Sequence, residues 1–192
     1  FNLSNFESEG IYSEAICNKL AVKIDDDSAF VTAKDMEFDK NGTTFTMKIQ
    51  GKKEFRVTIN LLGKHNVQNV LQAVALAYKL GLSIEQIKVG LSKLRPVKHR
   101  LELVQLDKGA VLLDDSFNSN ILGTKSALDV LGKFKQKNKI VITPGLIEMG
   151  NREAIENLKF GKNISQVATK VYIVNKVNRR FIMKGLQDNG FD

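Results

Sequence analysis

The chain has 192 residues and carries 29 Lys and Arg against 21 Asp and Glu, a formal net charge of +8. Its hydrophobic fraction of 43% and charged fraction of 26% are typical of a globular protein, which excludes wholesale disorder. The single cysteine, Cys17, excludes an internal disulfide and a cysteine-rich zinc site, and it predicts a reducing compartment. No apolar run approaches the roughly 18 residues of a membrane span. Because the chain begins at Phe1, we expect it to be part of a longer protein.

The basic excess has two interpretations. It suits an anionic partner such as a nucleotide phosphate, a nucleic acid or an acidic surface. It also fits lysines that simply face solvent, as expected for Lys133, Lys135, Lys137 and Lys139. A nucleic-acid binder would need interleaved exposed aromatic residues or a known reader motif, and the sequence shows neither. We therefore expect no nucleic-acid partner.

The first 60 residues predict strands and turns. A short apolar run covers residues 29–33, and residues 43–49 alternate in polarity after the turn at Asn41-Gly42. With the run over 55–59, this pattern predicts an antiparallel hairpin or meander. Residues 12–20 are ambiguous and could form a helix.

The next segment changes from a period of two to a helical period. Apolar residues recur at helical spacing from Asn66 to Leu80, and Gly81 supplies a stop. Ser83 and Gln86 form a capping box that predicts a second helix, which ends before Pro96. A domain boundary is expected within residues 95–101.

The remainder of the chain alternates strands with helices. We expect strands at 110–113, 139–143 and 170–174, and helices at 124–134, 153–167 and 179–187. This order is typical of a mostly parallel sheet flanked by helices, in which ligands gather at the carboxyl ends of the strands. Those ends carry Asp114-Asp115-Ser116 and Thr143-Pro144-Gly145.

The first candidate site is the segment from Gly63 to Asn69. Asn66 and Asn69 lie three residues apart, so both amides project from one side of the first helical turn. An amide offers donors and an acceptor that complement an adenine edge. Alternatively, His65 and Asn66 serve only as helix caps.

Two further candidates follow in the second half of the chain. Arg100 can place its guanidinium fork on phosphate oxygens, with Lys98 beside it; the alternative is a solvated basic linker. Asp114 and Asp115 at a strand end can bind ribose hydroxyls or the water shell of a metal; the alternative is a polar turn with helix caps.

Taken in this order, the three segments resemble the Mur ligase family of ATP-dependent amide ligases, and within it the branch that adds D-alanyl-D-alanine. The family shows Gly-x-His-Asn-x-x-Asn, then Arg-Leu-Glu, then Asp-Asp-(Ser/Thr)-Tyr-Asn-Ala-Asn-Pro, then Glu-(Leu/Met)-Gly. The matching residues in this chain are Gly63, His65, Asn66 and Asn69; Arg100, Leu101 and Glu102; Asp114, Asp115, Ser116, Asn118 and Asn120; and Glu148, Met149 and Gly150.

The resemblance implies an α/β fold in two parts. Residues 1–96 would be the tail of a P-loop-type central ATPase domain, made of strands plus a helical pair. Residues 97–192 would be the first portion of a Rossmann-like C-terminal domain with a mostly parallel sheet.

The resemblance also implies which residues bind the nucleotide: His65, Asn66, Asn69, Arg100, Asp115, Asn118 and Asn120. Asn66 and Asn69 would bind adenine, in a pocket shaped by His65. Arg100 would be the catalytic residue that reaches the ATP phosphates, and Asp115 would hold the ribose. Asn118 and Asn120 would line the cleft.

By the same resemblance, the cofactors are ATP and Mg²⁺, and the other partner is a UDP-muramoyl peptide in the bacterial cytoplasm. An acyl phosphate forms first, and an amine, D-alanyl-D-alanine in this branch, then displaces phosphate. No residue of this chain is assigned to Mg²⁺, and the P-loop Gly-x-x-Gly-Lys-(Ser/Thr) is absent, so we expect the chain alone to be inactive.

Other departures keep two alternatives open. Phe117 stands where the family has Tyr, and Thr143-Pro144-Gly145 stands where the branch has Leu-Gly-Asp. The chain could therefore be part of a paralogous Mur ligase that uses another amine as its substrate. It could also be a non-catalytic module that binds a nucleotide or a partner.

Overall fold

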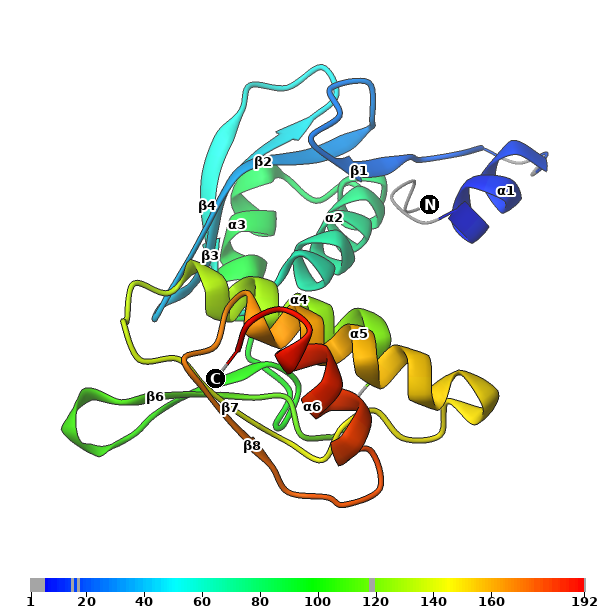
Figure 1. Ribbon diagram of the computed structural model, residues 1–192. Helices are drawn as coiled ribbons and strands as arrows, with labels where there is room; N and C mark the ends of the chain where they lie inside the picture. The colour runs from blue at the N-terminus through cyan, green and yellow to red at the C-terminus, as the bar shows by residue number, and fades with distance from the viewer. Residues whose placement is uncertain (1–5, 15, 17, 118–119, 192) are drawn as a thin grey trace. The chain divides into compact units, whose positions relative to one another are not determined.

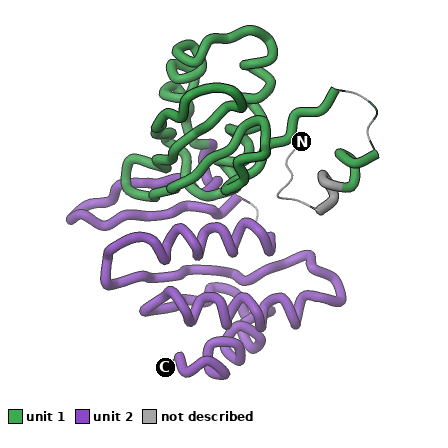
Figure 2. The backbone as a smooth tube through the Cα atoms, turned by 90° about the horizontal axis from the view of Figure 1, so that it is seen from above, with its two compact units in different colours: residues 1–96 green, residues 97–192 purple. Residues whose placement is uncertain are grey.

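The computed structural model describes residues 6–14, 16, 18–117 and 120–191. The chain divides into two compact units, residues 1–96 and 97–192 (Figure 2). These are the two ranges that the sequence distinguishes, and their assignment to domains of a ligase stays a prediction. Among the described helices, none combines the length and the apolar character needed to cross a membrane.

The first unit is built on a four-stranded sheet. β1 runs parallel to β2, and β2, β3 and β4 are successively antiparallel, which confirms the predicted hairpin. A Cβ on Gly42, where φ is 119°, would lie 2.1 Å from the carbonyl oxygen of Ile59, so the start of β3 requires glycine. The strands are β1 (Val22–Ile24), β2 (Val31–Asp39), β3 (Gly42–Ile49) and β4 (Phe55–Ile59).

Two helices, α2 (Lys64–Lys79) and α3 (Ile84–Ser92), pack against this sheet (Figure 1). The predicted capping box is confirmed, because Ser83 Oγ accepts the Gln86 N–H at 3.2 Å and the Ser83 N–H donates to Gln86 Oε1 at 2.8 Å. The shared core includes Phe45, Met47, Ile49, Ile59, Val67 and Leu71.

The N-terminal helix differs from the expectation for residues 12–20. The helix α1 spans Phe6–Glu14, and residue 18 onward leads without helix into β1. The apolar residues of Phe6–Glu14 do not recur at helical spacing, so the sequence pattern does not indicate a helix over these residues.

The second unit contains two pairs of strands. β5 (Glu102–Gln105) and β6 (Val111–Asp114) form an antiparallel hairpin, while β7 (Ile140–Thr143) and β8 (Lys170–Ile173) are parallel. The parallel pair and its helices confirm the predicted α/β class. The strand β5 was not predicted, and it makes β6 the second arm of a hairpin.

The helices of the second unit are α4 (Ile121–Lys133), α5 (Glu153–Ser165) and α6 (Arg179–Gln187), all near their predicted ranges. α5 and α6 lie side by side (Figure 1) because glycines occupy their contact. A Cβ on Gly161 would lie 2.2 Å from the carbonyl oxygen of Ile182, and one on Gly185 would lie 2.1 Å from that of Leu158. The core around this contact includes Leu128, Leu146, Phe160, Ile164 and Leu186.

Candidate functional site

The first two turns of α2 hold three of the residues expected to bind a nucleotide. His65 and Asn69 are exposed and Asn66 is half-buried, with its Nδ2 donating to the carbonyl oxygen of Leu62 at 2.8 Å. The helix begins at Lys64, and its N-cap, Gly63, has φ of 91° and no side-chain cap. The alternative in which His65 or Asn66 caps this helix is therefore wrong, because both lie inside the first turn.

In the second unit, the turn at residues 97–101 lies against the end of β6. The Leu101 N–H donates to Asp115 Oδ1 at 3.0 Å, and the Phe117 N–H donates to the carbonyl oxygen of His99 at 3.1 Å. These hydrogen bonds join the segments that carry two predicted site residues, Arg100 and Asp115. Asp115 is half-buried, while Arg100 is exposed.

The Arg100 side chain lies over an aromatic ring. Its Cζ atom is 4.3 Å from the centroid of the Phe117 ring, which is the geometry of a cation–π contact. Such a contact restricts the guanidinium without using its N–H donors. Within the described part of the chain, the guanidinium donors take part in no hydrogen bond and can reach phosphate oxygens.

The turn that carries Arg100 is conformationally strained. His99 has φ of 62° and Leu101 has φ of 51°, in a region that non-glycine residues rarely adopt. Each such residue costs about 1–3 kcal/mol and persists only where surrounding contacts hold it. Leu101 is 2% exposed, so part of that support comes from burial.

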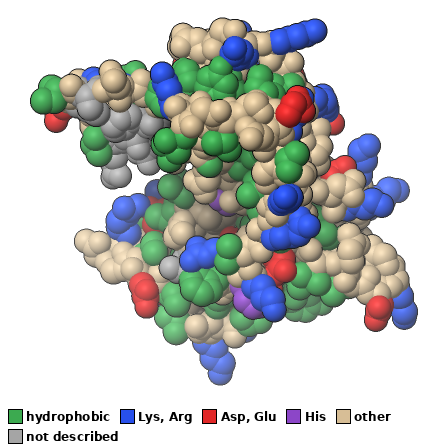
Figure 3. Space-filling view, turned by 180° about the vertical axis from the view of Figure 1, so that it is seen from behind, with side chains coloured by type: hydrophobic (Ala, Val, Ile, Leu, Met, Phe, Trp, Pro, Cys, Tyr) green, Lys and Arg blue, Asp and Glu red, His purple; other side chains and the backbone are tan. Residues whose placement is uncertain are grey.

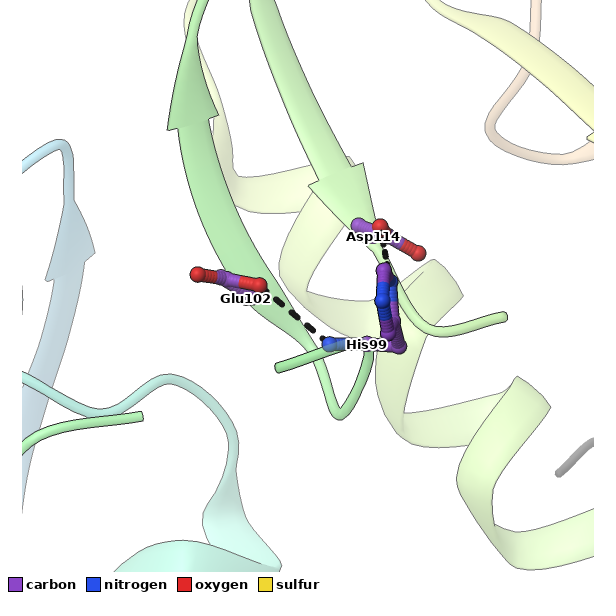
Figure 4. Close-up of side chains that lie close together, drawn as sticks. All are labelled: His99, Glu102 and Asp114. Carbon is purple, nitrogen blue, oxygen red and sulfur yellow. Dashed lines mark hydrogen bonds and ion pairs between the residues drawn. The ribbon is translucent and has the colours of Figure 1, made fainter. Parts of the chain in front are cut away.

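Further support comes from two carboxylates that contact His99 (Figure 4). His99 Nδ1 lies 2.8 Å from Asp114 Oδ2, and the His99 backbone N–H donates to Glu102 Oε2 at 3.2 Å. Hydrogen bonds from the Ser116 side chain and then from His99 hold the pKa of Asp114 below its ordinary value. Sequence reasoning missed this cluster because it did not predict β5, which pairs Glu102 with Asp114.

His99, Glu102 and Asp114 also form the one group of possible metal ligands among the described residues, with ligand atoms within 4.8 Å of one another. Each side chain already takes part in a hydrogen bond of the turn. Mg²⁺ prefers oxygen ligands and retained waters to imidazole nitrogen. The group therefore does not fit the Mg²⁺ that the family resemblance implies.

The asparagines after β6 differ in what the structure shows. Asn120 is the N-cap of α4, with its Oδ1 accepting the Gly123 N–H at 2.8 Å. The alternative that this segment supplies helix caps is thus correct for Asn120. Asn118 lies outside the described residues.

A buried polar clamp fixes the loop after β7. The Leu146 N–H donates to Asn157 Oδ1, and its carbonyl oxygen accepts Nδ2 of both Asn157 and Asn178, all at 2.8 Å. Both asparagines are at most 1% exposed. A Cβ on Gly145, where φ is 88°, would lie 2.8 Å from Asn157 Oδ1. The sequence signal that could have revealed this clamp is the position of Asn157 on the apolar face of α5, together with Phe160 and Ile164.

The basic side chains do not gather into one patch on the face seen in Figure 3. There, Lys and Arg are scattered among acidic, apolar and other side chains. On this face, the distribution is that of lysines that face solvent and not of a continuous basic surface.

Residues 4–77 match a family described as the Mur ligase middle domain. A UDP-N-acetylmuramoyl-tripeptide–D-alanyl-D-alanine ligase from Haemophilus influenzae is 34% identical over 136 residues, which cover 71% of this chain and 29% of that ligase. A UDP-N-acetylmuramoylalanine–D-glutamate ligase from Listeria monocytogenes is 34% identical over 132 residues, 69% of this chain and 28% of that ligase. The chain thus spans less than a third of the length of these relatives.

Solved structures show the same fold. MurF from Acinetobacter baumannii aligns with a TM-score of 0.76 at 22% identity, covering 91% of this chain and 42% of that one. A MurF ligase from Thermotoga maritima, solved in complex with ADP, aligns with a TM-score of 0.72 at 18% identity, covering 90% and 44%. The family match over residues 4–77 and the relatives at 34% identity show that the chain belongs to the Mur ligase family.

Proposed function

We propose that the chain is part of an ATP-dependent C–N ligase of peptidoglycan precursor synthesis, working in the bacterial cytoplasm on a UDP-muramoyl peptide. The observation that carries this proposal is the 34% identity to a ligase over 136 residues. Each compact unit has 96 residues, so an alignment of 136 residues includes part of both units. Residues 1–96 would then belong to the central ATPase domain and residues 97–192 to the C-terminal domain.

The residues proposed to bind the nucleotide lie in each of the two units. In the first, the amides of Asn66 and Asn69 would bind adenine, and His65 would shape the pocket. The exposed position of Asn69 on the second turn of α2 leaves its amide accessible to a base. The structure of a relative with ADP supports a nucleotide as the ligand.

In the second unit, Arg100 and Asp115 would bind the phosphates and the ribose. Asp115 Oδ1 accepts the Leu101 N–H, so Oδ2 is the oxygen proposed to accept a ribose hydroxyl. As the N-cap of α4, Asn120 would contribute to the site by fixing where this helix begins. Asn118 stays a proposed lining residue of the cleft.

The proposed reaction has two steps. A substrate carboxylate attacks the γ-phosphate of ATP, which gives an acyl phosphate and ADP, and an amine then attacks the acyl carbon and releases phosphate. The Arg100 guanidinium would stabilise charge on the phosphoryl oxygens as it develops. Mg²⁺ would supply further charge neutralisation from ligands outside this chain.

The amine substrate has two candidates. D-alanyl-D-alanine is favoured by the name of the Haemophilus influenzae relative, yet the D-glutamate ligase of Listeria monocytogenes is equally identical. Gly145 favours a paralogue that uses another amine. Asp stands at this position in the D-alanyl-D-alanine branch, and any Cβ there would collide with Asn157 Oδ1 at 2.8 Å.

Calorimetric titration with a non-hydrolysable ATP analogue tests the nucleotide site. We expect saturable binding without ATP turnover, because the chain has no P-loop. Asn69→Ala and Asp115→Asn should each weaken binding by roughly three- to tenfold, the effect of losing one hydrogen bond. Gln72→Ala, an exposed amide one turn further along α2, should leave affinity unchanged.

The two variants test the residue assignment separately in each unit, Asn69 in the first and Asp115 in the second. Unchanged affinity in both variants would overturn the residue assignment, and measurable ATP turnover by this chain would overturn its inactivity.

A further inference from the structure

We propose that His99 and Asp114 are positioning residues, which hold Arg100 over Phe117 before a nucleotide binds. This inference rests on the proposed function, in which Arg100 contacts the phosphates. It adds His99 and Asp114 to the proposed site as residues that act on the nucleotide only through Arg100.

The argument begins with the backbone on both sides of Arg100. Its neighbours His99 and Leu101 both adopt left-handed conformations, at φ of 62° and 51°. Their positions in a tight turn fix the direction in which the Arg100 side chain leaves the backbone. Removing the contacts that support either neighbour should therefore let the turn relax toward ordinary dihedral angles.

His99 is the residue on which these contacts converge. Its ring lies 2.8 Å from Asp114 Oδ2, its N–H donates to Glu102, and its carbonyl oxygen accepts the Phe117 N–H at 3.1 Å. The last contact is the important one, because Phe117 carries the ring on which the Arg100 guanidinium rests. His99 therefore ties the turn both to the end of β6 and to the support of Arg100.

The two carboxylates are held by the sheet itself. Glu102 and Asp114 are directly paired across β5 and β6, so their positions follow from strand register. Like charges in such a pair repel one another unless a donor lies between them. His99 supplies donors in that place, as Figure 4 shows, with its backbone nitrogen toward Glu102 and its ring toward Asp114. Rigid elements thus hold the positioning residue, as precise placement requires.

A purely structural role for His99 predicts a different result from a positioning role. Both predict a lower stability when the side chain is removed. Only positioning predicts that Arg100 leaves the Phe117 ring in a chain that stays folded, and that the effect on nucleotide affinity disappears once Arg100 is absent.

The first measurement is the proton chemical shift of the Arg100 side chain in the nucleotide-free chain. The Phe117 ring should shift the Arg100 resonances upfield, and Phe117→Leu defines the shift without the ring. We expect His99→Ala to lose most of the ring-current shift and His99→Gln to keep more of it, because an amide can still donate to Asp114. Asp107→Asn, at the other end of the β5–β6 hairpin, should keep it fully. A folded His99→Ala variant with the wild-type shift would overturn the proposal.

The second measurement is a double-mutant cycle on the affinity for the ATP analogue, with His99→Ala, Arg100→Ala and the double variant. We expect His99→Ala to weaken binding several-fold and the double variant to bind no more weakly than Arg100→Ala. Additive losses would overturn positioning. Unchanged affinity in Arg100→Ala would instead overturn its proposed phosphate role, and the ring-current result would still decide whether His99 positions it.

Discussion

Gly161→Ala should destabilise the second unit although alanine is the better helix former. Gly161 lies in α5 against the backbone of α6, and a Cβ there would be 2.2 Å from the carbonyl oxygen of Ile182. Ordinary contact begins near 3.4 Å, so the two helices would have to separate by about 1 Å. Ile182 and Leu186, at 0% and 3% exposure, would lose part of their packing.

The magnitude follows from two opposing effects. Overpacking of this kind costs about 1–3 kcal/mol, while replacing a helical glycine by alanine gains about 0.5–1 kcal/mol. We therefore expect the free energy of unfolding to fall by about 1–2 kcal/mol. The clamp on Leu146 should loosen as well, because Asn157 lies on α5 and Asn178 is the N-cap of α6.

Gly132→Ala is the matched control within the same unit. A Cβ on Gly132, in α4, would lie 3.8 Å from a methyl carbon of Val167, an ordinary contact. This variant should gain helix propensity alone and become more stable by about 0.5 kcal/mol.

The chain has no tryptophan, so unfolding is best followed by amide hydrogen exchange of α5 and α6 in increasing urea. Gly161→Ala should exchange faster than the wild type, and Gly132→Ala should not. Equal stability in the two variants would refute the close packing of α5 against α6.

Two further predictions concern a helix cap and a carboxylate. Ser83→Ala should lower the stability of the first unit by about 0.5–2 kcal/mol in urea unfolding, because the hydroxyl accepts the Gln86 N–H; an unchanged midpoint would contradict the capping box. Asp114→Asn should remove an acid-sensitive part of the stability of the second unit. The Ser116 and His99 hydrogen bonds lower the folded-state pKa of Asp114, so this stabilisation is present above the unfolded pKa and is lost as pH falls through the folded pKa. Thermal unfolding between about pH 5 and 2 should therefore depend less steeply on pH in the variant, and an identical slope would contradict the linkage.

Local patterns in the sequence predicted most of the secondary structure. The hairpin of β3 and β4 followed from alternation and a glycine turn, and α6 was predicted at its observed bounds because its apolar period is clear. The strand β5 was not predicted, because Leu101 to Leu106 forms a short run whose partner lies across a turn at Asp107–Gly109. Strand pairing is a tertiary property, so a run of four residues does not reveal it.

The candidate site, too, depends on strand pairing that local sequence patterns do not reveal. Motif order pointed to Arg100 and Asp115, and the structure joins their segments through the Leu101 N–H. No motif pointed to the contact between His99 and Asp114, which are 15 residues apart and meet only because β5 and β6 pair in one register. A shift of that register by one residue would turn Glu102 or Asp114 to the opposite face of the hairpin.

Because the contact between His99 and Asp114 depends on this register, the β5–β6 hairpin contributes to the positioning of Arg100. The guanidinium of Arg100 is useful to a phosphate only if it is held in place before the nucleotide arrives, since ordering a long side chain on binding costs affinity. Here the ordering is done by a ring, a strained turn and two carboxylates on paired strands. A substitution that disturbs the hairpin far from Arg100 should therefore weaken nucleotide binding, whereas one that leaves its register intact should not.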